Sequence, residues 1–165
     1  MRLVLPRLYV VLDAALVTDP DSECAQKLAD AGVRMLQYRN KSASSRELFL
    51  SSRRLSSQLV PLGISFLVND RADVASVVDA TGVHVGQEDL SAEAARELMG
   101  MGKWVGVSTH NLEQFERAAA NFIVPLPPRR SPSHTASAVR IAMVRPFGSA
   151  EVRELYPASH FVAQT

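Results

Sequence analysis

Strand-like and helix-like segments alternate five times before residue 121, and this alternation constrains the fold more than any other feature. Apolar runs rich in β-branched residues indicate buried strands, and helical spacing with capping residues and glycines marks the segments between them. The expected strands are 8–12, 33–39, 64–68, 82–85 and 103–107, and the expected helices are 21–31, 44–59, 71–78, 91–99 and 111–120. This rhythm predicts a parallel α/β fold.

The chain length limits how much of such a fold can be complete. A closed (β/α)8 barrel takes ~250 residues, whereas this chain has 165. We therefore expect an incomplete TIM-barrel-type repeat of about five βα units out of eight, followed by an irregular C-terminal tail. Spacing alone does not separate a barrel from an open sheet. A dinucleotide or P-loop site is not indicated, because no glycine-rich phosphate motif follows the first strand.

The character of the sequence changes at Asn121. From there onward the chain holds six of its nine prolines, five arginines and no lysine. A strand could begin at 121–124, but Pro125 and the two prolines that follow shortly after would stop it. We divide the chain into a barrel-like part, 1–120, and a divergent Pro/Arg-rich tail, 121–165. The tail is either a flexible terminus or a departure of the reading frame or gene from its ancestral sequence, and the abrupt loss of rhythm favours the second.

Composition narrows the classes of partner. A net charge of +1 argues against a nucleic-acid-binding surface spread over the protein. A single cysteine, Cys24, rules out an intramolecular disulfide and suits a cytoplasmic location. No uninterrupted apolar run reaches the ~18 residues of a membrane-spanning helix, so we expect no membrane association.

Polar side chains follow four successive strands. They are Gln37, Arg39 and Lys41 after the second strand, Asn69 and Asp70 after the third, Gln87 to Asp89 after the fourth, and Ser108 to His110 after the fifth. Right-handed crossovers place the carboxyl ends of parallel strands on one side of a sheet. All four groups should therefore lie along one rim, where α/β barrels and open sheets bind their ligands.

The residue types at this rim suggest a chemistry. Asp70 and Asp89 are hard oxygen ligands of the kind Mg²⁺ prefers, and Mg²⁺ is commonly shared with substrate phosphates. Arg39 and Lys41 suit phosphate oxygens. The neutral groups, Gln37, Asn69 and Ser108, could orient a polar heterocycle or a leaving group. Together they suggest a magnesium-assisted displacement of pyrophosphate.

Each of these residues also has a structural explanation. Asp70 precedes a helix and could cap it, and Asp89 could likewise cap or support the helix that opens at Ser91. The two cations could be solvated loop charges. His84, inside its strand, is more easily explained as a core or rim histidine, and His110 as a capping residue near the fifth helix. Four groups on successive strand ends favour a site over four separate coincidences.

The motifs QYRNK, LVNDR, GVHVGQEDL and GVSTHN, in this order, resemble thiamine phosphate synthase over residues 8–120. The resemblance implies a TIM barrel that joins 4-amino-2-methyl-5-pyrimidinylmethyl diphosphate to a thiazole phosphate and releases pyrophosphate. It implies that Asp70 and Asp89 bind Mg²⁺, and that the pyrimidine lies against Gln37 and Ser108. The diphosphate would be held by Arg39, Lys41 and Asn69.

The resemblance ends where the tail begins. The family continues with a strand end of the form G-P-I-F-x-T-x-T-K, whereas this chain has FIVPLPPRRSPSHTAS. The part that binds thiazole phosphate is thus missing, and we expect little turnover by the chain alone. Two alternatives stay open: a thiazole tautomerase-like relative that uses His110, or a non-catalytic partial barrel that self-associates through its open edge.

Overall fold

The computed structural model describes residues 6, 8–114, 117 and 140–144. Strands and α-helices alternate over residues 8–114, and one further strand lies at 140–144. The elements in chain order are β1 (Val10–Asp13), α1 (Asp21–Asp30), β2 (Met35–Arg39), α2 (Ser45–Leu59), the 3-10 turn η1 (Val60–Leu62), β3 (Ser65–Asn69), α3 (Ala72–Val77), β4 (Gly82–Val85), α4 (Ala92–Met99), β5 (Trp104–Thr109) and β6 (Arg140–Val144). The expected fifth helix, 111–120, is described only in part.

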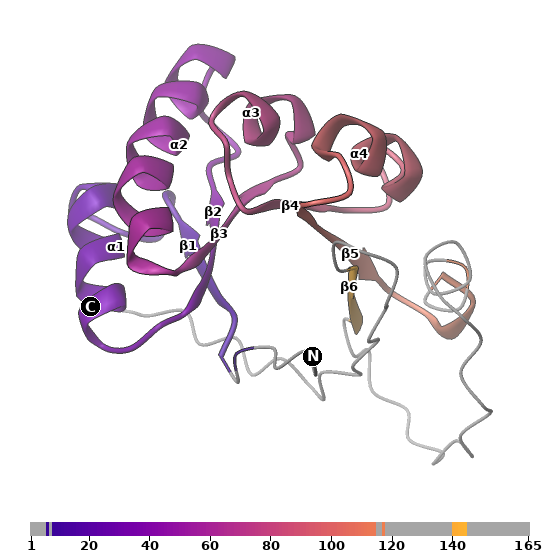
Figure 1. The fold of residues 1–165 in the computed structure, drawn as a ribbon, viewed down its shortest axis with the longest axis horizontal. Coiled ribbons are helices and arrows are strands. Elements are labelled where there is room, and N and C mark those ends of the chain that lie inside the picture. The colour runs from indigo at the N-terminus through magenta and orange to yellow at the C-terminus, as the bar shows by residue number, and fades with distance from the viewer. Residues whose placement is uncertain (1–5, 7, 115–116, 118–139, 145–165) are drawn as a thin grey trace.

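The first five strands lie side by side in chain order, and each is parallel to its neighbour. Helices α1 to α4 form an arc outside this curved sheet (Figure 1). Consecutive parallel strands with helices on one face are the arrangement of a βα barrel. The prediction of a parallel α/β fold of TIM-barrel type is confirmed, and the sheet stays unclosed over the described residues.

Strand β6 is a feature that the sequence did not predict. It pairs antiparallel with β5, with Val105 opposite Val144 and Thr109 opposite Arg140. The pairing uses backbone groups on the β5 edge that we expected to be open. Within the part of the chain that the structure describes, the outer strands of the sheet are therefore β1 and β6. The proline-rich stretch 125–139 lies outside the described residues.

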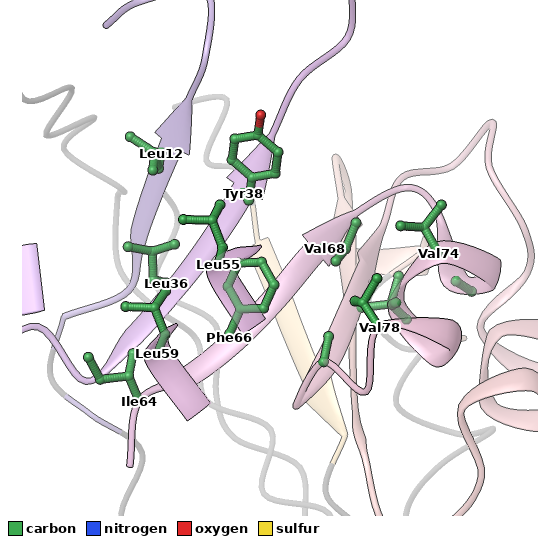
Figure 2. Packing of buried hydrophobic residues seen from close by; sticks show 14 of the residues in the cluster. Leu12, Leu36, Tyr38, Leu55, Leu59, Ile64, Phe66, Val68, Val74 and Val78 are labelled. Carbon is green, nitrogen blue, oxygen red and sulfur yellow. The ribbon is translucent and has the colours of Figure 1, made fainter. Parts of the chain in front are cut away.

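The core lies between the sheet and its helices. Successive strand residues point to opposite faces, so Leu36 and Tyr38 on β2 and Phe66 on β3 face the helices. They pack against Leu55 and Leu59 of α2 (Figure 2). The residues between them, including Gln37 and Asn69, face the other side of the sheet. The helix-covered face thus carries most of the core, while the opposite face holds a smaller buried cluster of Met35 and Leu67 beside its polar residues.

Local signals set the helix starts. Ser44 accepts a hydrogen bond from the Glu47 N–H, and the Glu47 carboxylate accepts from the Ser44 N–H, which forms a capping box on α2. Ser91 caps α4 through the Ala94 N–H. Pro20 occupies the N-cap position of α1, where no side chain makes a capping hydrogen bond. None of the helices in the described part of the chain is long and apolar enough to cross a lipid bilayer.

Candidate functional site

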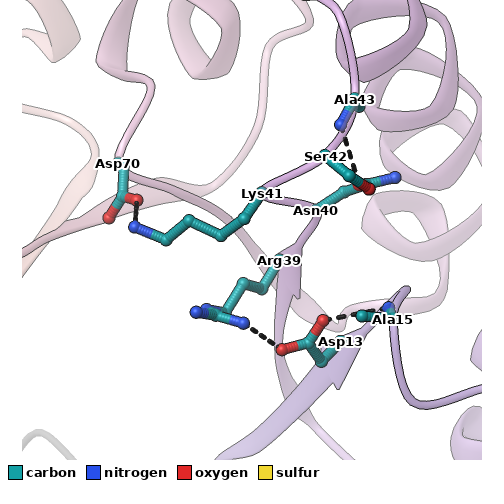
Figure 3. A network of polar contacts seen from close by, with 8 residues as sticks. All are labelled: Asp13, Ala15, Arg39, Asn40, Lys41, Ser42, Ala43 and Asp70. Atoms are coloured by element: carbon teal, nitrogen blue, oxygen red, sulfur yellow. Dashed lines mark hydrogen bonds and ion pairs between the residues drawn. The ribbon is translucent and has the colours of Figure 1, made fainter.

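Two cations lie at and just after the end of β2, and each pairs with a carboxylate at the end of a neighbouring strand. The Arg39 guanidinium pairs with Asp13, the last residue of β1 (Figure 3). Asp13 is fixed in turn, because its Oδ1 accepts a hydrogen bond from the Ala15 N–H at 3.0 Å. The Lys41 Nζ lies 2.6 Å from Oδ2 of Asp70, which follows β3. The cationic side chains stay 37% exposed for Arg39 and 57% exposed for Lys41, so both remain accessible to an anion.

Asp70 has an unusual backbone. Its φ is 63°, in the left-handed region that aspartate tolerates better than most residues. The Asp70 N–H donates to the His84 carbonyl at 2.7 Å, which ties this conformation to β4. Helix α3 begins after Arg71 and has no side-chain cap, so Asp70 is not a helix cap. The Asp70 carboxylate therefore does not cap α3 and can interact with other groups at the rim.

Asp89 turns back on the loop that follows β4. Its Oδ2 accepts a hydrogen bond from the Gly86 N–H at 2.8 Å. A Cβ on Gly86 would come within 2.9 Å of the same oxygen, so glycine gives the carboxylate room. The cap of α4 is Ser91, which removes the capping explanation for Asp89.

The two carboxyl groups influence one another. Partial burial raises the pKa of Asp89, and the neighbouring Asp70 carboxyl adds to the rise through a hydrogen bond and charge repulsion. The Gly86 N–H and the Lys41 ammonium act in the opposite direction on this pKa. Two carboxylates this close need a positive charge between or beside them when both are ionised, and Lys41 supplies one.

The carboxylates of Asp70 and Asp89 fit the donor set expected for Mg²⁺. Over the described residues, no group of three or more histidine, cysteine or acidic side chains gathers to hold a metal. A site with two carboxylates matches Mg²⁺, which keeps several waters and shares its remaining positions with substrate phosphates. It does not match a structural zinc site, which needs four protein ligands.

The neutral residues form a second part of the site, on the inner face of the sheet. The Gln37 Nε2 donates to the Tyr9 hydroxyl at 2.7 Å, and this hydroxyl lies 3.1 Å from Nδ1 of His84. The His84 Nε2 lies 2.9 Å from the Ser108 Oγ. Burial raises the pKa of Tyr9 and lowers that of His84 to about 4, so both side chains are neutral near pH 7.

The structure brings the predicted residues together in two groups. Lys41, Asp70 and Asp89 interact at the rim, with Asn69 one residue before Asp70 at the end of β3. Arg39 ends β2 nearby but pairs with Asp13 instead. Gln37 and Ser108 are joined through Tyr9 and His84. The sequence interpretation missed Tyr9 and Asp13. His84 is buried and both of its ring nitrogens have hydrogen-bond partners, as expected for a core or rim histidine. Asp13 could have been found, because it ends the first strand as the other site residues end theirs. His110 is exposed, and its backbone N–H donates to the Gln114 side chain at 2.8 Å.

Comparison with known proteins decides the family. The family model described as thiamine monophosphate synthase matches residues 8–137. The chain belongs to the thiamine monophosphate synthase family. A thiamine-phosphate synthase from Koribacter versatilis is 46% identical over 121 residues, which are 70% of this chain and 57% of that protein. Another from Shouchella clausii is 39% identical over 128 residues, 74% of this chain and 61% of that protein.

A solved structure supports the same assignment. A thiamine phosphate pyrophosphorylase from Pyrococcus furiosus matches with a TM-score of 0.61 and 34% identity, over 67% of this chain and 53% of that one. The chain spans between one half and two thirds of the length of these family members. The relatives carry the synthase name, which favours synthase ancestry over the tautomerase alternative.

Proposed function

We propose that this chain binds the aminopyrimidine diphosphate substrate of a thiamine phosphate synthase reaction, a transferase activity of thiamine biosynthesis. The observation that carries the proposal is the rim itself, where Lys41 pairs with Asp70 next to Asp89 and Arg39, at the same end of β2, pairs with Asp13. Such a pairing accepts a diphosphate and the divalent cation that accompanies it.

In this reaction the bond between the pyrimidine methylene carbon and the diphosphate oxygen breaks. The thiazole nitrogen then bonds to the same carbon, and pyrophosphate is released. Arg39 and Lys41 would donate hydrogen bonds to the departing oxygens and offset their growing negative charge. Mg²⁺ held by Asp70 and Asp89 would supply further positive charge to the leaving group. No protein nucleophile is required.

The neutral residues would hold the pyrimidine ring. Gln37 is buried at the inner face and Ser108 is half-buried, so both can present polar groups without exposing the reacting carbon to bulk water. Asn69 would add an amide donor near the diphosphate. Thiazole phosphate would bind to the second half of a complete barrel, so we expect the isolated chain to bind the diphosphate substrate and to turn over slowly. We propose a cytoplasmic location, and self-association through an open edge of the sheet is an alternative fate for this partial barrel.

A thermal melt tests the diphosphate rim. Mg²⁺ with pyrophosphate should raise the unfolding transition, by ~2.7 kcal/mol of stability at a ligand concentration of a hundred times the dissociation constant. Asp70→Asn and Arg39→Ala should abolish the rise. Asp30→Asn and Arg53→Ala, which change exposed helical side chains away from the rim, should keep it. A rise that persists in both rim variants, or no rise in the wild-type chain, would contradict the proposal.

A further inference from the structure

Tyr9 and His84 connect the two neutral residues of the site in a single hydrogen-bonded row. The row runs from Gln37 on β2 to the Tyr9 hydroxyl just before β1, then to His84 on β4 and Ser108 on β5. The rings of Tyr9 and His84 also lie close, with centroids 5.9 Å apart. Gln37 and His84 are each only 4% exposed, so water does not compete for these bonds.

The chemistry of the groups sets a direction along the row. The amide nitrogen of Gln37 can only donate, so the Tyr9 oxygen accepts its hydrogen bond. The Tyr9 hydroxyl then gives its own proton to its second partner, Nδ1 of His84. A neutral imidazole carries one N–H, so the proton of His84 resides on Nε2 and is donated to the Ser108 Oγ.

Both ends of the row are then defined. Ser108 receives a hydrogen bond on its oxygen, which leaves its hydroxyl proton to be donated to a ligand. Gln37 has used one amide proton, and its carbonyl oxygen has no hydrogen-bond partner among the described residues. One end therefore offers a donor, and the other offers an acceptor.

We propose that Tyr9 and His84 are positioning residues that fix this direction, and thereby select a heterocycle with an amino group beside an unprotonated ring nitrogen. The identity of the ligand rests on the proposed function. An aminopyrimidine donates through its amino group to the Gln37 carbonyl and accepts at its ring nitrogen from Ser108. A 4-oxo pyrimidine shows the opposite pair, an acceptor oxygen beside a ring N–H, and is rejected because both ends of the row would be mismatched.

The protonated nitrogen of His84 is the direct readout. Two-bond ¹H–¹⁵N correlation spectra of the full chain at pH 7.5, with His84→Gln used to assign the signal, report which ring nitrogen holds the proton. The wild-type chain should show the Nε2–H form. Tyr9→Phe removes the hydroxyl that donates to Nδ1, so this variant should populate both the Nε2–H and the Nδ1–H forms of His84. Tyr38→Phe is the matched control, because its hydroxyl donates to Asp21 outside the row, and should leave the spectrum unchanged.

Ligand choice is the second readout. Calorimetry with 4-amino-5-hydroxymethyl-2-methylpyrimidine and its 4-oxo counterpart, each with Mg²⁺ and pyrophosphate, should show a preference of about tenfold or more for the amino compound. The preference should disappear in Tyr9→Phe and persist in Tyr38→Phe. An Nδ1–H form in the wild-type chain, or a Tyr9→Phe variant with unchanged spectrum and preference, would overturn the inference. The expected Nε2–H form without binding of either pyrimidine would uphold the row's direction and contradict the proposed function instead.

Discussion

Gly82 is the position where a single methyl group should test the arrangement of the sheet. It begins β4 opposite Trp104 of β5. A Cβ at Gly82 would lie 2.5 Å from the Trp104 Cβ, 2.6 Å from its carbonyl oxygen and 3.0 Å from its Cα. Carbon atoms pack favourably at about 3.5–4.0 Å, so β4 and β5 would have to separate by about 1 Å. Two of the three atoms are backbone and the third is fixed directly to it, so a side-chain rotation cannot relieve the contact.

We expect Gly82→Ala to cost about 3 kcal/mol, the upper end of the range for overpacking. With a urea dependence of about 2 kcal/mol per molar, the midpoint of unfolding should fall by roughly 1.5 M. Gly102→Ala is the matched control, because a Cβ there meets nothing within 4 Å, and it should be neutral or slightly stabilising. Equal midpoints for the two variants would refute the close approach of β4 and β5. The same close packing of β4 and β5 brings His84 within hydrogen-bond distance of Ser108. Gly82→Ala should therefore weaken pyrimidine binding as well.

Two further predictions concern α2. In urea unfolding, Ser52→Ala should leave stability unchanged or raise it by about 1 kcal/mol, because the buried Ser52 Oγ has no hydrogen-bond partner among the described residues. Ser56→Ala should instead destabilise the protein, since the Ser56 hydroxyl donates to the Asp79 carbonyl. A Ser52→Ala variant less stable than Ser56→Ala would refute this. The Ser44 hydroxyl and N–H lower the pKa of Glu47, so the capping box stabilises α2 above the ordinary glutamate pKa and is lost as the pH falls through the lowered value. Ser44→Ala should cost about 1 kcal/mol and return the Glu47 pKa, measured by NMR titration, towards its ordinary value; an unchanged titration would rule out the capping box.

Much of the fold could be predicted because its signals are local. The βα rhythm, the Ser44 and Ser91 caps and the polar strand ends all depend on residues near one another in sequence. The parallel order of the strands then follows from the handedness of their connections. For this reason the sequence alone places the rim residues Asp70 and Asp89 on the same side of the sheet.

The unpredicted features depend on distant pairings. Tyr9 meets His84 across 75 positions, and this contact depends on the register of four strands rather than on any short pattern. Arg39 likewise meets Asp13 across 26 positions, through the pairing of β1 with β2. Strand β6 could not be foreseen from the rhythm, because it pairs antiparallel with β5 and so does not continue the parallel βα repeat.

The most direct test of the central claim is the binding of the unreacted pyrimidine diphosphate itself. Isothermal titration of the full chain with 4-amino-2-methyl-5-pyrimidinylmethyl diphosphate, with Mg²⁺ and then with EDTA, measures whether the rim is assembled in the absence of thiazole phosphate. We predict saturable binding with Mg²⁺ that is lost in EDTA and in Asp89→Asn. Absence of binding, or equal binding by the wild-type and Asp89→Asn chains, would contradict the claim that this rim holds the diphosphate.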